Sequence, residues 1–217
     1  MSGHRLAVTG WGVLSGAGEG IESLVEHVGA DRTGSSAGGP RDVGKMFGEP
    51  LPTDRAHALP DFDVRSHLGR KGTSNYDRTT ALAVVASGEA LREAGESASP
   101  DRVGVVVGTT LGSFRAAGEF SRETLIRDRP HHVAPGRIPS SVMNGAAGQT
   151  AIRYGLHGVN ATIAGGAIGF FGALRYAATV LRRGYVDTIV AGAVEELSPH
   201  RMWQGALSRA RRTPTIG

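Results

Sequence analysis

Residues 158–199 read GVNATIAGGAIGFFGALRYAATVLRRGYVDTIVAGAVEELSP, and this stretch indicates the class of fold. The short apolar run 161–164 predicts a strand. Residues 168–183 have the composition and spacing of a small-residue helix that ends at Gly184. Residues 187–191 predict a second strand. A buried strand, a helix and another buried strand in succession indicate an α/β protein with a largely parallel sheet.

The pattern continues toward the N-terminus. The run 103–107 (VGVVV) predicts a further buried strand, and residues 79–94 predict a helix with one apolar stripe and Gly95 as its C-cap. Residues 5–13 (RLAVTGWGV) predict a strand that enters a glycine-rich turn. The remaining segments are a helix at 21–28, an irregular excursion at 31–60, a mixed segment at 111–154 and a basic tail at 205–217.

The composition excludes several kinds of chemistry. The chain of 217 residues contains no cysteine, which excludes disulfides, thiolate metal sites, iron–sulfur ligation and a thiol nucleophile. No histidine-rich metal motif is present, and we expect no metal and no cofactor. Hydrophobic residues make up 40% and charged residues 20%, as in globular proteins.

The net charge of +4 does not indicate a nucleic-acid partner. The arginines are spread along the chain beside acidic residues, and no recognition motif accompanies them. No apolar run is long enough to cross a membrane, and no signal-peptide pattern opens the chain. We therefore expect a cytoplasmic protein that binds neither nucleic acid nor membrane.

Five ordered motifs resemble those of the β-ketoacyl synthases. The stretch 158–199 is similar to the family's Gly-x-Asn-x-Thr strand, its nucleophile turn and helix, and its last strand before Ser-Pro. Four other similar segments are RLAVTGWGVLS from residue 5, YDRTTALAVVASGEAL from residue 76, VGVVVGTTLGSF from residue 103 and PGRIPSSVMNGAAG from residue 135. The resemblance covers nearly the whole chain.

The resemblance implies a thiolase-like fold in which residues 1–217 form a ketosynthase-like N-terminal domain. This domain would be one βαβαβ half, with a mixed five-stranded sheet covered by helices. Family members carry two such halves, and the second half supplies two catalytic histidines. A single half is expected to expose an apolar face and to need a partner, either a second copy or an active ketosynthase chain.

The nucleophile position is the clearest departure from the family. Alignment through Ala173 and Leu174 places Ala167 where the family has its cysteine. A methyl group cannot accept an acyl chain. Phe170 and Phe171 follow in the helix that flanks the acyl pocket in the family, where they would either fill that pocket or pack in the core.

The resemblance also implies sites for acyl chains and for an acyl carrier protein. Residues 111–144 match the segment that lines the partner's acyl tunnel, which makes Phe114, Phe120 and Met143 pocket candidates. Arg70 and Lys71 match the basic residues that meet acyl carrier protein. The expected function is that of a chain-length-factor-like subunit in polyketide or fatty-acid assembly, without independent condensing activity.

Two other functions remain open. A dehydratase- or isomerase-type enzyme would use His131, His132 or Glu195 as acid or base in an inherited pocket. A pure scaffold would bind a partner but no acyl chain. For the residues themselves, a surface or loop position is the ordinary expectation for the histidine pair. Glu195 and Glu196 are more simply expected to hold loop amides or a neighbouring arginine.

Overall fold

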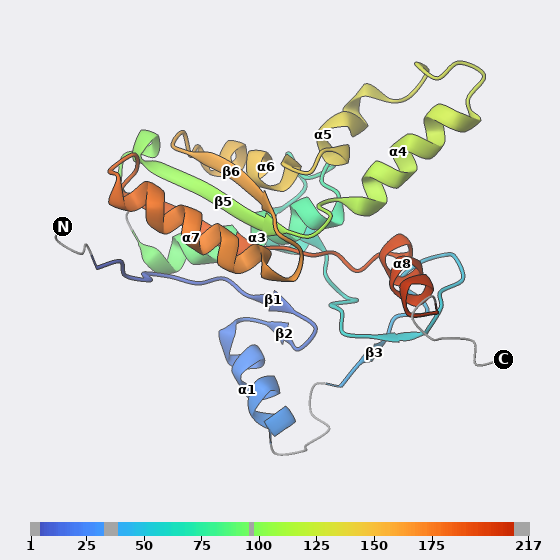
Figure 1. The fold of residues 1–217 in the computed structure, drawn as a ribbon, viewed down its shortest axis with the longest axis horizontal. Helices are drawn as coiled ribbons and strands as arrows, with labels where there is room; N and C mark the ends of the chain where they lie inside the picture. The colour runs from blue at the N-terminus through green and yellow to red at the C-terminus, as the bar shows by residue number, and fades with distance from the viewer. Residues whose placement is uncertain (1–4, 33–38, 96–97, 211–217) are drawn as a thin grey trace. The chain divides into compact units, whose positions relative to one another are not determined.

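A three-stranded parallel sheet forms the centre of the larger part of the chain. The computed structural model describes residues 5–32, 39–95 and 98–210. The strands β5 (Val103–Thr109), β6 (Asn160–Ala164) and β7 (Thr188–Ala193) are arranged in the order β6-β5-β7. Figure 1 shows β5 and β6 side by side. Every residue of β5 is buried, as expected for the central strand of a sheet with two covered faces.

Helices cover both faces of this sheet. Val105 and Val107 of β5 pack with Ala147 of helix α6 (Gly145–Tyr154). Gly108 instead faces helix α7 (Gly169–Arg182), where an added Cβ would lie 2.4 Å from the carbonyl oxygen of Gly169. Because neighbouring strand residues point to opposite faces, α6 and α7 lie on opposite sides of β5.

Helix α3 (Arg78–Ala94) packs against α6. Its N-terminus is capped by Asp77, which accepts hydrogen bonds from the backbone N–H of Thr79 at 3.0 Å and from the Thr80 hydroxyl at 2.5 Å. Gly95 forms the expected C-cap, and its positive φ of 77° is a conformation that glycine adopts readily. The remaining elements of this unit are α2 (Val64–Leu68), α4 (Phe114–Ile126), α5 (Ile138–Ser141) and the 3₁₀ turns Pro100–Arg102, Pro135–Arg137 and Gly166–Ile168.

The N-terminal segment differs from the expectation. Residues 5–13 form no strand, and the central sheet has three strands among the described residues, not the expected mixed five. The segment instead lies against α3, where the Trp11 N–H donates to Glu93 Oε2 at 2.7 Å. A Cβ at Gly10 would lie 2.3 Å from the carbonyl oxygen of Ala90. The glycines therefore allow this segment to lie directly on the backbone of α3. Among the described residues, the segment has no neighbouring strand to share backbone hydrogen bonds with, so its apolar run does not form a strand.

A second compact unit combines residues 14–62 with the segment from Leu197 onward. Its core contains Val43, Ala58 and Met202, which brings the expected excursion 31–60 together with helix α8 (Pro199–Ala210). Residues 205–210 of the expected basic tail belong to α8, and 211–217 lie outside the described residues. The elements are the pairs β1 (Leu14–Ser15) with β2 (Gly18–Glu19) and β3 (Arg41–Asp42) with β4 (Arg55–Ala56), and the helices α1 (Ile21–Arg32) and α8 (Pro199–Ala210).

Candidate functional site

The carboxyl ends of the three parallel strands gather the candidate site at one edge of the sheet. In open α/β sheets, ligands bind outside this edge. The turn after β6 is tied to the end of β5 by a hydrogen bond from Gly165 N–H to the Thr109 carbonyl at 3.1 Å. The segment after β7 is tied to β5 by a hydrogen bond from Val194 N–H to the Gly108 carbonyl at 3.0 Å.

Ala167 lies in the turn that leads into α7. This turn is the 3₁₀ segment Gly166–Ile168, in which Gly166 has φ 57° and Ala167 is exposed. The helix N-terminus that follows favours negative charge on a side chain held beside it. The alanine methyl group carries neither a proton to lose nor a lone pair, so this side chain cannot act as a nucleophile.

The two phenylalanines after this turn are exposed. Phe170 is 43% exposed and Phe171 67%, and their rings meet edge to face with centroids 5.7 Å apart. Ile168 beside them is also exposed. These side chains do not pack in the core of the chain, so the core-packing interpretation of the pair is not what the structure shows. They form an apolar surface next to Ala167.

The other pocket candidates lie on and near α4. Phe114 is the first residue of this helix and Phe120 lies in its middle, both partly buried. Met143 is exposed and reaches the loop before α4, since a Cβ at Gly112 would lie 3.0 Å from the Met143 Cα. Gly112 has φ 61°, so both its conformation and the close approach of Met143 require glycine.

Glu195 and Glu196 hold the loop between β5 and α4. Glu195 Oε1 accepts a hydrogen bond from the Thr110 N–H and lies 3.4 Å from the Thr109 hydroxyl. Glu196 Oε1 accepts from the Arg115 N–H at 2.9 Å. The expectation that this pair holds loop amides is confirmed.

Glu196 is a buried carboxylate among other ionisable groups. Only 7% of the surface of Glu196 is exposed. Burial raises the pKa of Glu196, the Arg115 N–H opposes this shift, and the Asp77 carboxylate adds to it. Burial also lowers the pKa of Arg78, and Glu196 counters that effect. Glu196 therefore connects the start of α4 with the residues that begin α3.

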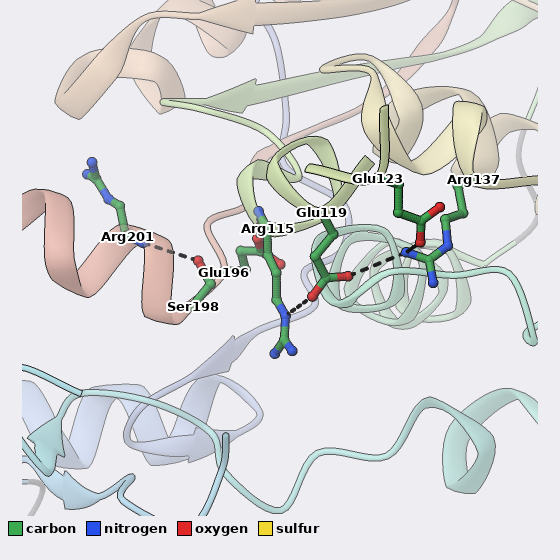
Figure 2. A network of polar contacts seen from close by, with 7 residues as sticks. All are labelled: Arg115, Glu119, Glu123, Arg137, Glu196, Ser198 and Arg201. Atoms are coloured by element: carbon green, nitrogen blue, oxygen red, sulfur yellow. Dashed lines mark hydrogen bonds and ion pairs between the residues drawn. The ribbon is translucent and has the colours of Figure 1, made fainter. Parts of the chain in front are cut away.

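A ladder of ion pairs continues along α4, as Figure 2 shows. Arg115 Nε lies 2.7 Å from Glu119 Oε1, and Arg137 Nη1 lies 3.0 Å from Glu123 Oε1 and 3.8 Å from Glu119 Oε2. Sequence reasoning did not identify this ladder. The spacing of Arg115 and Glu119 could have indicated the first pair. Arg137 comes from the segment that returns after α4, and no local pattern indicates its contacts.

The histidine pair lies away from Glu195. His131 and His132 are exposed in the loop after α4, with their rings edge to face at 4.7 Å. Glu195 holds the loop before α4, and this helix of 13 residues is about 20 Å long. The structure therefore does not bring the three proposed acid/base residues together.

The expected carrier-docking residues are on the surface. Arg70 and Lys71 are exposed in the turn between α2 and α3. Arg153 of α6 holds the backbone of this turn, donating to the Leu68 and Lys71 carbonyl oxygens at 3.1 Å each. The turn is thus fixed to the main unit while its basic side chains stay accessible.

The acidic residues, the histidines and the helices of the described part of the chain bear on metal and membrane binding. No group of three or more histidine, aspartate or glutamate residues there could hold a metal ion. None of the helices in that part is both long and apolar enough to span a bilayer.

The sheet order β6-β5-β7, with a helix on each face and a glycine turn leading into α7, defines a thiolase-like α/β protein. The family described as Beta-ketoacyl synthase, N-terminal domain, matches residues 4–215, and the chain belongs to this family. The resemblance stated from the motifs is confirmed.

Similar proteins support this assignment. The 3-oxoacyl-[acyl-carrier-protein] synthase 2 of Staphylococcus aureus (strain COL) is 28% identical over 214 residues, which cover 96% of this chain and 50% of that protein. A solved structure titled "The ishigamide ketosynthase/chain length factor" has a TM-score of 0.79 and 34% identity, covering 97% of this chain and 57% of that one. The chain spans about half the length of the curated relatives it matches.

A third structure supports the fold alone. It is titled "AntDE:AntF (apo): type II PKS acyl-carrier protein in complex with its ketosynthase bound to the hexaketide". Its TM-score is 0.72 at 19% identity, with 95% of this chain and 55% of that chain covered.

Proposed function

We propose that this protein is a non-condensing ketosynthase-like subunit. It pairs with an active ketosynthase or with a second copy of itself, and it shapes an acyl tunnel during polyketide or fatty-acid assembly on an acyl carrier protein. The expected cytoplasmic location is part of this proposal. The similarity to a ketosynthase/chain length factor supports a place in acyl-chain assembly.

The observation that carries the proposal is Ala167 at the start of α7. Condensing chemistry needs a group that forms a covalent bond with the acyl carbonyl carbon. The turn that would present this group carries a methyl side chain, and the chain contains no cysteine that a shift of alignment could place there. The acyl intermediate is therefore carried by the partner subunit.

The exposed apolar side chains beside this turn support the need for a partner. Ile168, Phe170 and Phe171 lie together in sequence and are exposed. Exposed contiguous apolar surface commonly marks a protein interface or a ligand-binding groove. Burial of Phe171 against a partner would remove its ring from water, which stabilises a complex by about 2 kcal/mol.

The test is reconstitution with an active ketosynthase and its acyl carrier protein. Phe114→Ala and Phe120→Ala are each introduced into this chain, and the product lengths are measured by mass spectrometry. Both substitutions enlarge the space beside α4, so we expect longer products from an intact complex. Leu125→Ala at the exposed end of α4 is the matched control. Unchanged products from complexes that still assemble would contradict the tunnel role.

The same reconstitution separates the alternatives. Activity of the isolated chain on an acyl carrier substrate, lost in His131→Ala or His132→Ala, would support the dehydratase or isomerase function. Binding of the ketosynthase without any effect of Phe114 or Phe120 on products would support a scaffold.

A further inference from the structure

The start of α4 lacks the local cap that most helices have. Ser113 occupies the N-cap position, yet its side chain makes no capping hydrogen bond. The first N–H groups of a helix have no partner within the helix, and a nearby acceptor normally satisfies one of them. At α4 this acceptor comes from a distant part of the chain, since Glu196 accepts from the Arg115 N–H at 2.9 Å.

Glu196 is well suited to hold this helix in place. A carboxylate at a helix N-terminus is favoured by the helix dipole, and a hydrogen bond to a carboxylate is shorter and stronger than one between neutral groups. Glu196 follows directly after β7 and Glu195, which itself accepts from the Thr110 N–H. Two consecutive carboxylates thus fasten both ends of the short loop between β5 and α4 to the end of the neighbouring strand.

The surroundings of Glu196 limit its movement. The residue is buried, and it lies close enough to Asp77, Arg78 and Arg115 for their charges to interact. Asp77 is already engaged as the cap of α3. A buried carboxylate with one backbone donor and fixed charged neighbours has few alternative positions, because any other position would leave it unpaired in a poorly solvated place.

We infer that Glu196 is a positioning residue that sets where α4 begins and, through α4, the shape of the acyl tunnel. The inference rests on the proposed function, in which Phe114 and Phe120 line that tunnel. Phe114 directly precedes the residue whose N–H Glu196 accepts, so a shift of this attachment moves Phe114 with it. The ion pairs of Arg115 with Glu119 and of Glu119 with Arg137 then transmit a change at the start of α4 to the rest of the helix (Figure 2).

The experiment measures hydrogen exchange of the Arg115 amide in the full chain, together with product length in the complex with an active ketosynthase. Glu196→Ala removes the acceptor, and we expect exchange of this amide to become at least about tenfold faster. Glu196→Gln keeps an oxygen at the same reach and should restore slow exchange and the wild-type products. Asp128→Ala removes an exposed carboxylate just beyond the end of α4 and should leave Arg115 exchange unchanged.

If Glu196→Ala does not fold, Glu196→Asp decides the question, because it keeps the charge and shortens the side chain by one methylene. Exchange within twofold of wild type in a folded Glu196→Ala or Glu196→Asp chain would overturn the inference. Fast exchange with unchanged products would also overturn it, provided that Phe114→Ala and Phe120→Ala do change the products. If those two variants leave the products unchanged as well, the proposed function fails instead.

Discussion

Two regions at the same edge of the sheet differ in how they are held and in what they expose. The turn at Gly166–Ile168 after β6 presents Ala167, and exposed apolar side chains follow it. The loop between β5 and α4 is held by two carboxylates, one of them buried. Under the proposed function, the reactive group and the architecture around it are separable. The turn carries a methyl group at Ala167, while the start of α4 keeps its attachment to the end of β7.

Both regions depend on close packing at the end of β5. Gly108 lies against Gly169, the first residue of α7, and it pairs within the sheet with both neighbouring strands. Any disturbance at Gly108 should therefore affect the turn and the loop together. Disturbances in one region alone should have smaller and distinct effects.

The largest effect is expected from Gly108→Val. Its Cβ would lie 2.4 Å from the Gly169 carbonyl oxygen, and the Gly108 backbone is held by its pairing with both neighbouring strands. We expect a loss of about 3 kcal/mol in the free energy of unfolding, measured by urea denaturation. Gly148→Ala is the control, because nothing lies within 4 Å of a Cβ at Gly148. Equal stability of the two variants would contradict the packing described here.

A change of intermediate size is expected in the pH dependence of stability. Burial raises the pKa of Glu196 in the folded chain, so the protonated side chain adds to the free energy of unfolding. This contribution is fully present below the ordinary glutamate pKa. It is lost as the pH rises through the folded-state pKa. Glu196→Gln cannot titrate, so the wild type should lose stability relative to this variant over that range. Asp77, Arg78 and Arg115 surround the side chain at position 196 in both proteins, so the difference in stability between them reports the titration of Glu196.

The measurement is the free energy of unfolding in urea across a series of pH values. The difference between wild type and Glu196→Gln should change in the stated direction. Parallel curves for the two proteins at all pH values would show that Glu196 has the same pKa folded and unfolded.

The smallest effect on stability is expected from Phe171→Ser. The ring is 67% exposed, so its removal should change the free energy of unfolding of the isolated chain by no more than about 0.5 kcal/mol. Ala173→Leu on the fully buried side of the same helix should cost about 2 kcal/mol. Affinity for an active ketosynthase, measured by calorimetry, should fall for Phe171→Ser. Strong destabilisation of the isolated chain by Phe171→Ser would mean that the ring is not free for a partner.

The sequence predicted the central elements well because their signals are local. The apolar run of β5 and the stripe of α3 require burial wherever they occur, and glycines mark their ends. The strand expected at 5–13 did not form, because a strand also needs a neighbour to share its hydrogen bonds, and this segment lies on α3 instead.

The candidate site was predictable where a family motif covers it and unpredictable where contacts are tertiary. The motifs placed Ala167 in the turn before a helix, and the structure has it there. The pairing of Arg137 with Glu123 joins two segments whose approach depends on how the loop after α4 returns. The cap that Glu196 gives to α4 depends in the same way on the adjacency of β5 and β7.

The intact mass of each subunit, measured after the reconstituted complex has been loaded with an acyl carrier substrate, shows which chain carries the acyl group. We expect an acyl adduct on the partner ketosynthase and none on this chain. In the variant Ala167→Cys, the turn at the start of α7 should gain the capacity to carry an acyl group or to react with iodoacetamide. An acyl adduct on the wild-type chain would contradict the proposed non-condensing role.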